Sequence, residues 1–394
     1  MARSGFIGQA GRKKGEPAKR GVPWYFIADV APEGAPRKQI KRGGFPTKGA
    51  AQTALTELLS KLQEGTYVAP SKQSLSEFIE NWLAAIGSTV RKSTLASYRR
   101  NLEQHVVPTI GHLPLRSLDA GALNALYAKL LLSGRRDSKD GGLSPRTVRY
   151  IATILQRALR DAVRWGRISV NPATAADPPR AKVVKEAQPT MQVWSAAEVE
   201  RFLTLTAPSR YQSAWLTLVT TGMRRGELLA LTWSDIKLDE QTISIRKALV
   251  VVAHVPQLGP TKTGKARSIE LDARTVSALR SWRSQQAQER LFMGSGYQDS
   301  GLVFTHPDGR WYHPERFSRE FDRAVERHGM SRIRLHDLRH TWATLALEAG
   351  VHVKVVSERL GHTSTMITLD TYSHVSGAVA SDAAEQVANL IFGT

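Results

Sequence analysis

Residues 171–190, with the sequence NPATAADPPRAKVVKEAQPT, place the strongest constraint on the fold, because they hold four prolines and few large apolar residues. Proline has no backbone N–H to donate and cannot continue a helix or a central strand, so such a stretch is typical of a linker between domains. We expect separate folded units on either side, with the linker itself at residues 178–192. A chain of 394 residues is long enough for two or three such units.

Residues 1–70 predict a small basic domain. Its first twenty residues are rich in Gly, Lys and Arg and are expected to be disordered. Residues 24–30 and 37–45 are predicted strands, separated by a turn rich in proline and glycine. Thr47 is a predicted N-cap of a helix that ends near Gly65. These elements would form a sheet of two or three strands with one helix.

The second of these strands carries four cations, which are Arg37, Lys38, Lys41 and Arg42. Charged side chains on an edge strand can simply protect it against aggregation. A basic strand can also enter a groove of DNA. The aromatic residues of the neighbouring strand and the basic tail favour the second interpretation.

Residues 71–177 predict a helical domain. Its expected helices cover residues 74–86, residues 93–107 with Pro108 as the stop, residues 119–132, and a last one that Ser144 and Pro145 begin. The last helix carries arginines largely outside its apolar stripe, among them Arg146, Arg149 and Arg157. These arginines either form a solvated surface or contact phosphates.

Residues 193–394 predict a third domain, mainly helical with a small β-sheet. The sequence Ser195-Ala-Ala-Glu198 has the spacing of a capping box and begins its first helix. The whole chain is therefore expected to be a multidomain α+β protein.

Composition narrows the class of partner. Lys and Arg total 55 against 35 Asp and Glu, a net charge of +20, which is typical of proteins that bind nucleic acid. A ribosome-like structural binder and a basic membrane-surface protein are the alternatives. The chain has no cysteine, which excludes a disulfide scaffold, Cys-ligated zinc and a thiol nucleophile. We expect no secretory signal and no membrane span, since no run of 18 apolar residues occurs.

Five short strings in the third domain carry the chemistry. TGMRRGELLAL, at residues 221–231, places Arg224 at a helix junction with Glu227 three residues later to orient it. The turn at residues 260–267 holds several cations and is predicted to be the tip of a hairpin between strands at 242–245 and 268–271. In HDLRH, at residues 336–340, His336 and Arg339 share one helix face. The strings LGH, at 360–362, and TYSH, at 371–374, follow. Each string alone is more often structural than functional.

Together, in this order and at this spacing, the five strings resemble the tyrosine recombinase (phage integrase) family over about residues 195–375. The two preceding regions are similar to the arm-binding and core-binding domains of lambda-like integrases. The match implies the catalytic positions Arg224, Lys262, His336, Arg339, His362 and Tyr372, with Glu227 as a supporting residue. Lys265 is the alternative to Lys262, and the neighbouring Arg225 leaves a shift of one residue open.

The resemblance implies that Tyr372 attacks the phosphorus and forms a 3′-phosphotyrosine, while the two arginines bind the phosphate oxygens. Lys262 would be the general acid for the leaving sugar oxygen. His336 would be a base or a positioning group, and His362 a hydrogen-bond donor to phosphate. This chemistry implies no metal and no nucleotide cofactor.

The implied partners are double-stranded DNA attachment sites and a homo-tetramer on DNA, with DNA-bending and excisionase-type accessory proteins as further candidates. The implied location is the bacterial cytoplasm at the nucleoid. Residues 379–391 predict an apolar helix that either completes its own domain or docks on a neighbouring protomer. The alternatives are a recombinase that resolves DNA dimers, a type IB topoisomerase, and a catalytically silent architectural DNA-binding protein. The basic N-terminal sheet disfavours a dimer-resolving recombinase, and the domain layout disfavours a type IB topoisomerase. The complete catalytic set disfavours a silent architectural protein.

Overall fold

The computed structural model describes residues 5–12, 16–31, 36–64, 67, 72–135, 141–188, 191–252, 255–261, 264, 266–362 and 364–372. The chain divides into two compact units, Met1–Gln188 and Pro189–Thr394. Among the described residues, helices dominate and three small antiparallel sheets accompany them, so the predicted multidomain α+β class is confirmed. In the described part of the chain, no helix is both long and apolar enough to cross a membrane.

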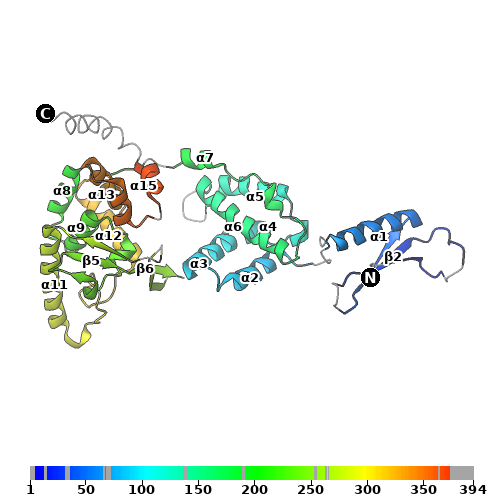
Figure 1. Cartoon of the computed structure of the whole chain (residues 1–394), viewed down its shortest axis with the longest axis horizontal. Helices are drawn as coiled ribbons and strands as arrows, with labels where there is room; N and C mark the ends of the chain where they lie inside the picture. Colours follow the sequence, from blue (N-terminus) through cyan, green and yellow to red (C-terminus); the bar gives the residue numbers. More distant parts are fainter. Residues whose placement is uncertain are drawn as a thin grey trace, which may run out of the picture. The chain divides into compact units, whose positions relative to one another are not determined.

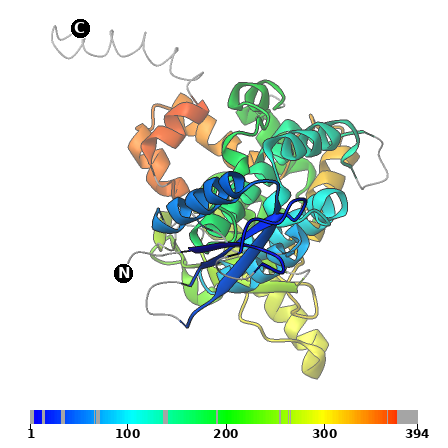
Figure 2. The same ribbon diagram turned by 90° about the vertical axis from the view of Figure 1, so that its right-hand side faces the viewer.

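The chain begins with a three-stranded antiparallel sheet in the order β1 (Gly5–Gln9), β2 (Trp24–Asp29) and β3 (Gln39–Phe45). Helix α1 (Lys48–Gln63) lies across one face of this sheet (Figures 1 and 2). Alternate residues of β2, among them Phe26 and Ala28, are buried under the leucines of α1, as the period of two in a strand requires. The Thr47 hydroxyl accepts the Ala50 N–H at 3.1 Å, which confirms the predicted cap.

Strand β1 corrects the prediction that the first twenty residues are disordered. It pairs with β2 along its whole length. The buried Gln9 amide donates to the carbonyls of Lys19 and Val22 at 3.1 and 2.8 Å, and its oxygen accepts the Lys19 N–H at 2.9 Å. The content of glycine and cations suggested disorder, but the strand ladder and this one amide hold the segment in place.

A helical domain follows, with a single apolar core. Its helices are α2 (Leu75–Ile86), α3 (Lys92–Asn101), α4 (Val107–Ile110), α5 (Ala120–Ser133), α6 (Pro145–Arg164) and α7 (Ala181–Glu186). Ser144 caps α6 with Pro145 as its first residue, as predicted. Inside the core, the Trp82 indole N–H donates to the buried Asp161 carboxylate at 2.8 Å. Helix α7 lies within the segment interpreted as a linker.

The prediction that Pro108 stops the second helix is wrong. The chain passes from α3 through a π-helical turn, Leu102–Val106, directly into α4, which contains Pro108. In this turn the Val107 N–H donates to the carbonyl of Leu102, five residues back. A π turn changes the hydrogen-bond register, so proline can follow it at the start of the next helix without breaking the path of the chain.

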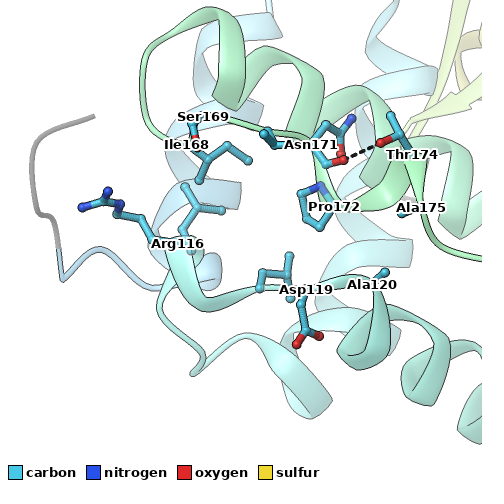
Figure 3. A pocket seen from close by; sticks show the side chains of 12 residues that line it. Arg116, Asp119, Ala120, Ile168, Ser169, Asn171, Pro172, Thr174 and Ala175 are labelled. Carbon is cyan, nitrogen blue, oxygen red and sulfur yellow. Dashed lines mark hydrogen bonds between the residues drawn. The ribbon is translucent and has the colours of Figure 1, made fainter. Parts of the chain in front are cut away.

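A cavity of about 350 Å³ opens where residues 168–175 pass the start of α5 (Figure 3). Polar residues that line the cavity already form hydrogen bonds with neighbouring groups of the protein. Asp119 accepts the Ala122 N–H at 2.7 Å as the cap of α5, and Asn171 accepts the Thr174 hydroxyl at its carbonyl at 2.8 Å. The Asn171 side-chain amide also donates to the Gln156 carbonyl of α6 at 3.2 Å, and this bond anchors the segment to the helical domain, although the sequence placed it in a proline-rich connection.

The second unit surrounds a large core with an aromatic cluster that includes Trp194, Trp215 and Phe321. Its helices are α8 (Ala196–Leu205), α9 (Gln212–Thr221), α10 (Arg225–Leu228), α11 (Ala273–Met293), α12 (Pro314–Arg327), α13 (Asp337–Glu348), α14 (Val353–Leu360) and α15 (Thr365–Tyr372). Its strands are β4 (Ile236–Lys237), β5 (Thr242–Ile245), β6 (Lys247–Val252), β7 (Val255–Pro260) and β8 (Arg267–Glu270). The predicted capping box at Ser195 is confirmed, with reciprocal bonds between Ser195 and Glu198.

The connection between β5 and β8 differs from the prediction. These two strands pair as expected, but a second hairpin, β6 with β7, lies between them. β5 and β8 are therefore not joined directly: β7 ends at Pro260 and β8 starts at Arg267.

Candidate active site

A buried carboxylate, Glu227, lies at the centre of the site with only 1% of its surface exposed. Gly222 ends α9 in the left-handed conformation at φ 63°, and Arg224 then caps the short helix α10. The Arg224 Nη1 donates to Glu227 Oε1 at 2.9 Å, and the Arg224 backbone N–H donates to Oε2 at 2.9 Å. Glu227 therefore orients Arg224, as the sequence predicted.

A second guanidinium binds the same carboxylate from β8. The Arg267 Nη1 donates to Glu227 Oε1 at 3.0 Å, and its Nη2 donates to Oε2 at 2.6 Å. Burial alone would raise the pKa of Glu227. The hydrogen bonds and charge of Arg267, with those of Arg224, instead hold that pKa below its ordinary value. The carboxylate is thus charged and shared by two cations.

Three arginines meet three consecutive carbonyls at the end of α14. Arg267 Nε donates to the Arg359 carbonyl at 2.9 Å, Arg339 Nη2 to the Leu360 carbonyl at 2.6 Å, and Arg224 Nη2 to the Gly361 carbonyl at 3.3 Å. The last carbonyls of a helix lack partners within the helix and carry partial negative charge. We call Arg224, Arg267 and Arg339 the arginine cluster. The end of α14 brings its members together.

The HDLRH string places a histidine beside this cluster. His336 precedes the first residue of α13, and the buried Arg339 follows one turn later and donates from Nη1 to the Gly222 carbonyl at 2.8 Å. His336 is exposed as a residue, yet the protein packed around its ring lowers its pKa to about 4. The nearby His340, Arg339 and Arg224 contribute to this lowering, and the carboxylate of Asp337 opposes it.

His362 directly follows the carbonyls that the arginines bind. Its Nδ1 lies 2.8 Å from the hydroxyl of Thr368, a buried residue of α15. Burial, together with the nearby charges of Arg339 and Arg224, lowers the pKa of His362 to about 4. The ring is therefore neutral at pH 7, with one nitrogen engaged by Thr368.

The structure brings five of the predicted residues together, which are Arg224, Glu227, His336, Arg339 and His362. Tyr372 is the last residue of α15, one helical turn after Thr368, and its side chain lies outside the described part of the structure. Lys262 and Lys265 lie outside the described residues. The predicted helix at residues 379–391 also lies outside them.

Sequence reasoning missed three residues of this site, namely Arg267, Arg359 and Thr368. Arg267 was visible only as one of several cations in a turn. Arg359 donates from Nη2 to the carbonyls of Thr220 and Glu270, at 3.2 and 2.8 Å, and so fastens α14 to α9 and β8. The contacts of Arg267 and Arg359 join segments far apart in the sequence, so local spacing could not predict them. Thr368 lies only six residues after His362, but no motif marked it.

The two basic surfaces predicted to contact DNA differ in the groups of this protein that their cations contact. Strand β3 begins at Gln39, two residues later than predicted, so Lys41 and Arg42 lie on it while Arg37 and Lys38 precede it. All four cations are exposed, and the Lys41 Nζ lies 4.0 Å from the centre of the Tyr25 ring. Arg37 forms an ion pair with Asp29 at 3.5 Å.

On α6, Arg146 is exposed at the start of the helix. Arg149 donates to the Pro179 carbonyl at 2.7 Å, and Arg157 donates to the Tyr98 hydroxyl at 3.2 Å. Two of the three α6 arginines predicted to contact DNA therefore already bind groups of the same compact unit. Among the described residues, no three His, Asp or Glu side chains gather as metal ligands would.

Comparison with known proteins agrees with this arrangement. The phage integrase family model matches residues 192–378, the Arm DNA-binding domain model matches residues 16–62, and the model of the N-terminal SAM-like domain of phage integrases matches residues 74–131. A protein of Caldanaerobacter subterraneus subsp. tengcongensis named tyrosine recombinase XerC-like is 24% identical over 399 residues, covering 96% of this chain and 99% of that protein.

Two solved structures share the fold. The integrase of the Tn1549 transposon, in complex with transposon right end DNA, matches with a TM-score of 0.65 and 20% identity, over 80% of this chain and 99% of that one. The lambda integrase tetramer bound to a Holliday junction matches with a TM-score of 0.57 and 18% identity, over 88% of this chain and 92% of that one.

Proposed function

The chain belongs to the phage integrase family, the tyrosine recombinases, and from this premise we propose that it cuts and rejoins DNA at specific sites through a phosphotyrosine on Tyr372. The observation that carries the proposal is the arrangement at the end of α14. There the guanidiniums of Arg224 and Arg339 bind adjacent carbonyls directly before His362.

The two arginines fit the demands of a phosphodiester. Its negative charge repels a nucleophile, and more charge develops on its oxygens during attack. Guanidiniums match phosphate geometry and stay charged at every relevant pH. Since carbonyls and Glu227 already fix the orientation of Arg224 and Arg339, little reorganisation would accompany substrate binding.

The roles of the other site residues follow from the bonds that form and break during cleavage. The Tyr372 oxygen would form a bond to phosphorus, and the bond from phosphorus to the 5′ oxygen of the sugar would break. That oxygen would take a proton from Lys262, with Lys265 as the alternative. His336, neutral at pH 7, is available to accept the tyrosine proton or to position it. His362, also neutral, would donate a hydrogen bond to the phosphate. Religation reverses these steps, so no external energy source is consumed.

The N-terminal sheet is the proposed contact with DNA outside the cleavage site. The exposed cations of β3 and the neighbouring Tyr25 would enter a groove, and Arg146 at the start of α6 would contact a phosphate. We extend the proposal to double-stranded attachment sites of a phage or mobile element and to a homo-tetramer on DNA. The proposed setting is the nucleoid of a bacterial host, with DNA-bending and excisionase-type proteins as accessory partners. A dimer-resolving recombinase would share the chemistry but act on other sites.

The test is capture of the covalent intermediate. The full chain is incubated with nicked duplexes that carry the ends of its own element, with a chelator present, and the reaction is stopped in detergent. Wild type should leave protein attached to a 3′ phosphate, and Tyr372→Phe should leave none. Tyr297→Phe, which keeps the ring that packs against Arg290, is the matched control and should react like wild type. Binding without any adduct on the correct sites would overturn the proposal in favour of an architectural DNA-binding protein.

A further inference from the structure

We infer that Arg267 is a positioning residue for DNA cleavage: by binding Glu227 through both nitrogens of its fork, it keeps that carboxylate from withdrawing Arg224 from the phosphate. This inference rests on the proposed function and concerns a residue outside the six predicted catalytic positions. Its support comes from the way in which two guanidiniums divide one buried carboxylate.

The Arg267 side chain is 12% exposed, and each of its three guanidinium nitrogens donates to an acceptor. Nη1 and Nη2 bind the two oxygens of Glu227, and Nε binds the Arg359 carbonyl at 2.9 Å. Two parallel bonds to a carboxylate are the arrangement for which a guanidinium is suited and an ammonium is not. The geometry therefore depends on arginine at this position.

The two arginines share the hydrogen bonds of the Glu227 carboxylate unequally. Arg267 takes both oxygens, whereas the Arg224 side chain reaches Glu227 only from Nη1 at 2.9 Å and directs Nη2 to the Gly361 carbonyl. Without Arg267, the buried carboxylate would keep Arg224 as its one guanidinium partner among those described. A buried charge that loses a partner is costly, so Glu227 would attract Arg224 into the vacant bidentate position. The guanidinium meant for the phosphate would then be turned and neutralised.

The same side chain also supports the segment that carries His362. It binds the Arg359 carbonyl, and its guanidinium packs so closely on Gly361 that a Cβ atom there would lie 3.1 Å from Nη1. Arg267 thus holds two partners of the site at once, the carboxylate that orients Arg224 and the turn that precedes His362. Errors of about 1 Å in such positions cost on the order of 10²-fold in rate.

The experiment measures the single-turnover rate of adduct formation on nicked substrate, the affinity for the same DNA, and the thermal midpoint of the full chain. Arg267→Gln should lower the rate by on the order of 10²-fold with little change in DNA affinity. Arg267→Lys should restore only part of the rate, because an ammonium cannot bind both oxygens in parallel. Arg280→Gln is the matched control, since Arg280 pairs with Asp239 on the surface of α11. It should react at the wild-type rate.

A double-variant cycle with Glu227→Gln identifies the route of the effect. If Arg267 acts through the Glu227 charge, its loss should matter little once Glu227→Gln has removed that charge. In the Glu227→Gln background, Arg267→Gln should therefore lower the rate of adduct formation by less than about threefold. The double variant also leaves no unpaired buried charge, so it keeps the comparison valid if Arg267→Gln alone folds poorly. Effects that multiply, or a wild-type rate in Arg267→Gln, would overturn the inference. If the wild-type protein itself formed no adduct on the correct sites, the proposed function would be refuted instead.

Discussion

The glycine at the end of α14 offers a direct test of how tightly the arginine cluster is packed. Gly361 has φ +65°, and Gly350, which follows α13, has φ +76°. Alanine at either position carries the left-handed penalty of about 1–2 kcal/mol. At Gly350 a Cβ atom meets nothing within 4 Å. At Gly361 it would lie 3.1, 3.2 and 3.3 Å from the Nη1, Cζ and Cδ of Arg267.

The difference between the two variants isolates the contact with Arg267. That side chain cannot simply swing aside, because three hydrogen bonds fix it. Forcing it off its rotamer costs about 0.5–1.5 kcal/mol. For a domain of this size, 1 kcal/mol corresponds to about 2–4 °C in Tm. Gly361→Ala should therefore melt about 1–6 °C below Gly350→Ala.

Scanning calorimetry of the full-length variants measures these midpoints, and adduct formation on nicked DNA measures the consequence for the site. Gly350→Ala should react like wild type. Gly361→Ala should react more slowly, because it displaces both Arg267 and the carbonyl that Arg224 binds. Equal midpoints and equal rates for the two variants would refute the packing argument.

Three further outcomes are expected. Thr368→Val should slow adduct formation roughly tenfold, because it removes the hydroxyl that holds His362, whereas Thr368→Ser should retain most of the rate. The free energy of unfolding should fall as the pH is lowered from about 6.5 towards 4. In that range the unfolded chain binds protons at His336 and His362 before the folded chain does, so denaturant titrations should show a smaller pH slope when both are glutamine. Asp161→Ala should cost about 1–3 kcal/mol, because the Trp82 indole N–H loses its acceptor, and Asp161→Asn should cost less in thermal unfolding.

The sequence predicted those features that depend on neighbours along the chain. The caps at Thr47, Ser144 and Ser195 each need only a side-chain oxygen two or three residues before a free N–H, and all three are confirmed. The helix junction predicted at Arg224 needs only a preceding residue that tolerates positive φ, which is Gly222, and it too is confirmed. In the site, local strings indicated Arg224, Glu227 and the pair in HDLRH.

Features that depend on distant partners could not be predicted. The pairing of Arg267, at the start of β8, with Glu227, in α10, joins residues 40 positions apart, so it depends on the packing of distant elements and not on any spacing in the sequence. Strand β1 was missed for the same reason, because its order comes from β2 and from the buried Gln9. The hairpin β6–β7 was missed because its insertion leaves the pairing of the flanking strands unchanged. The assignments of Lys262 and of the DNA-contacting cations remain predictions.

The three carbonyls at the end of α14 belong to the peptide backbone, and this changes which methods can detect their contribution. Replacing the side chains of Arg359 or Leu360 leaves the carbonyl oxygens where they are, so a conventional alanine scan would pass over these acceptors. An ester in place of the amide that follows Leu360 weakens that carbonyl as an acceptor while the side chains stay the same. Semisynthesis of the catalytic segment would therefore detect a part of this site that gene-encoded substitution leaves untouched.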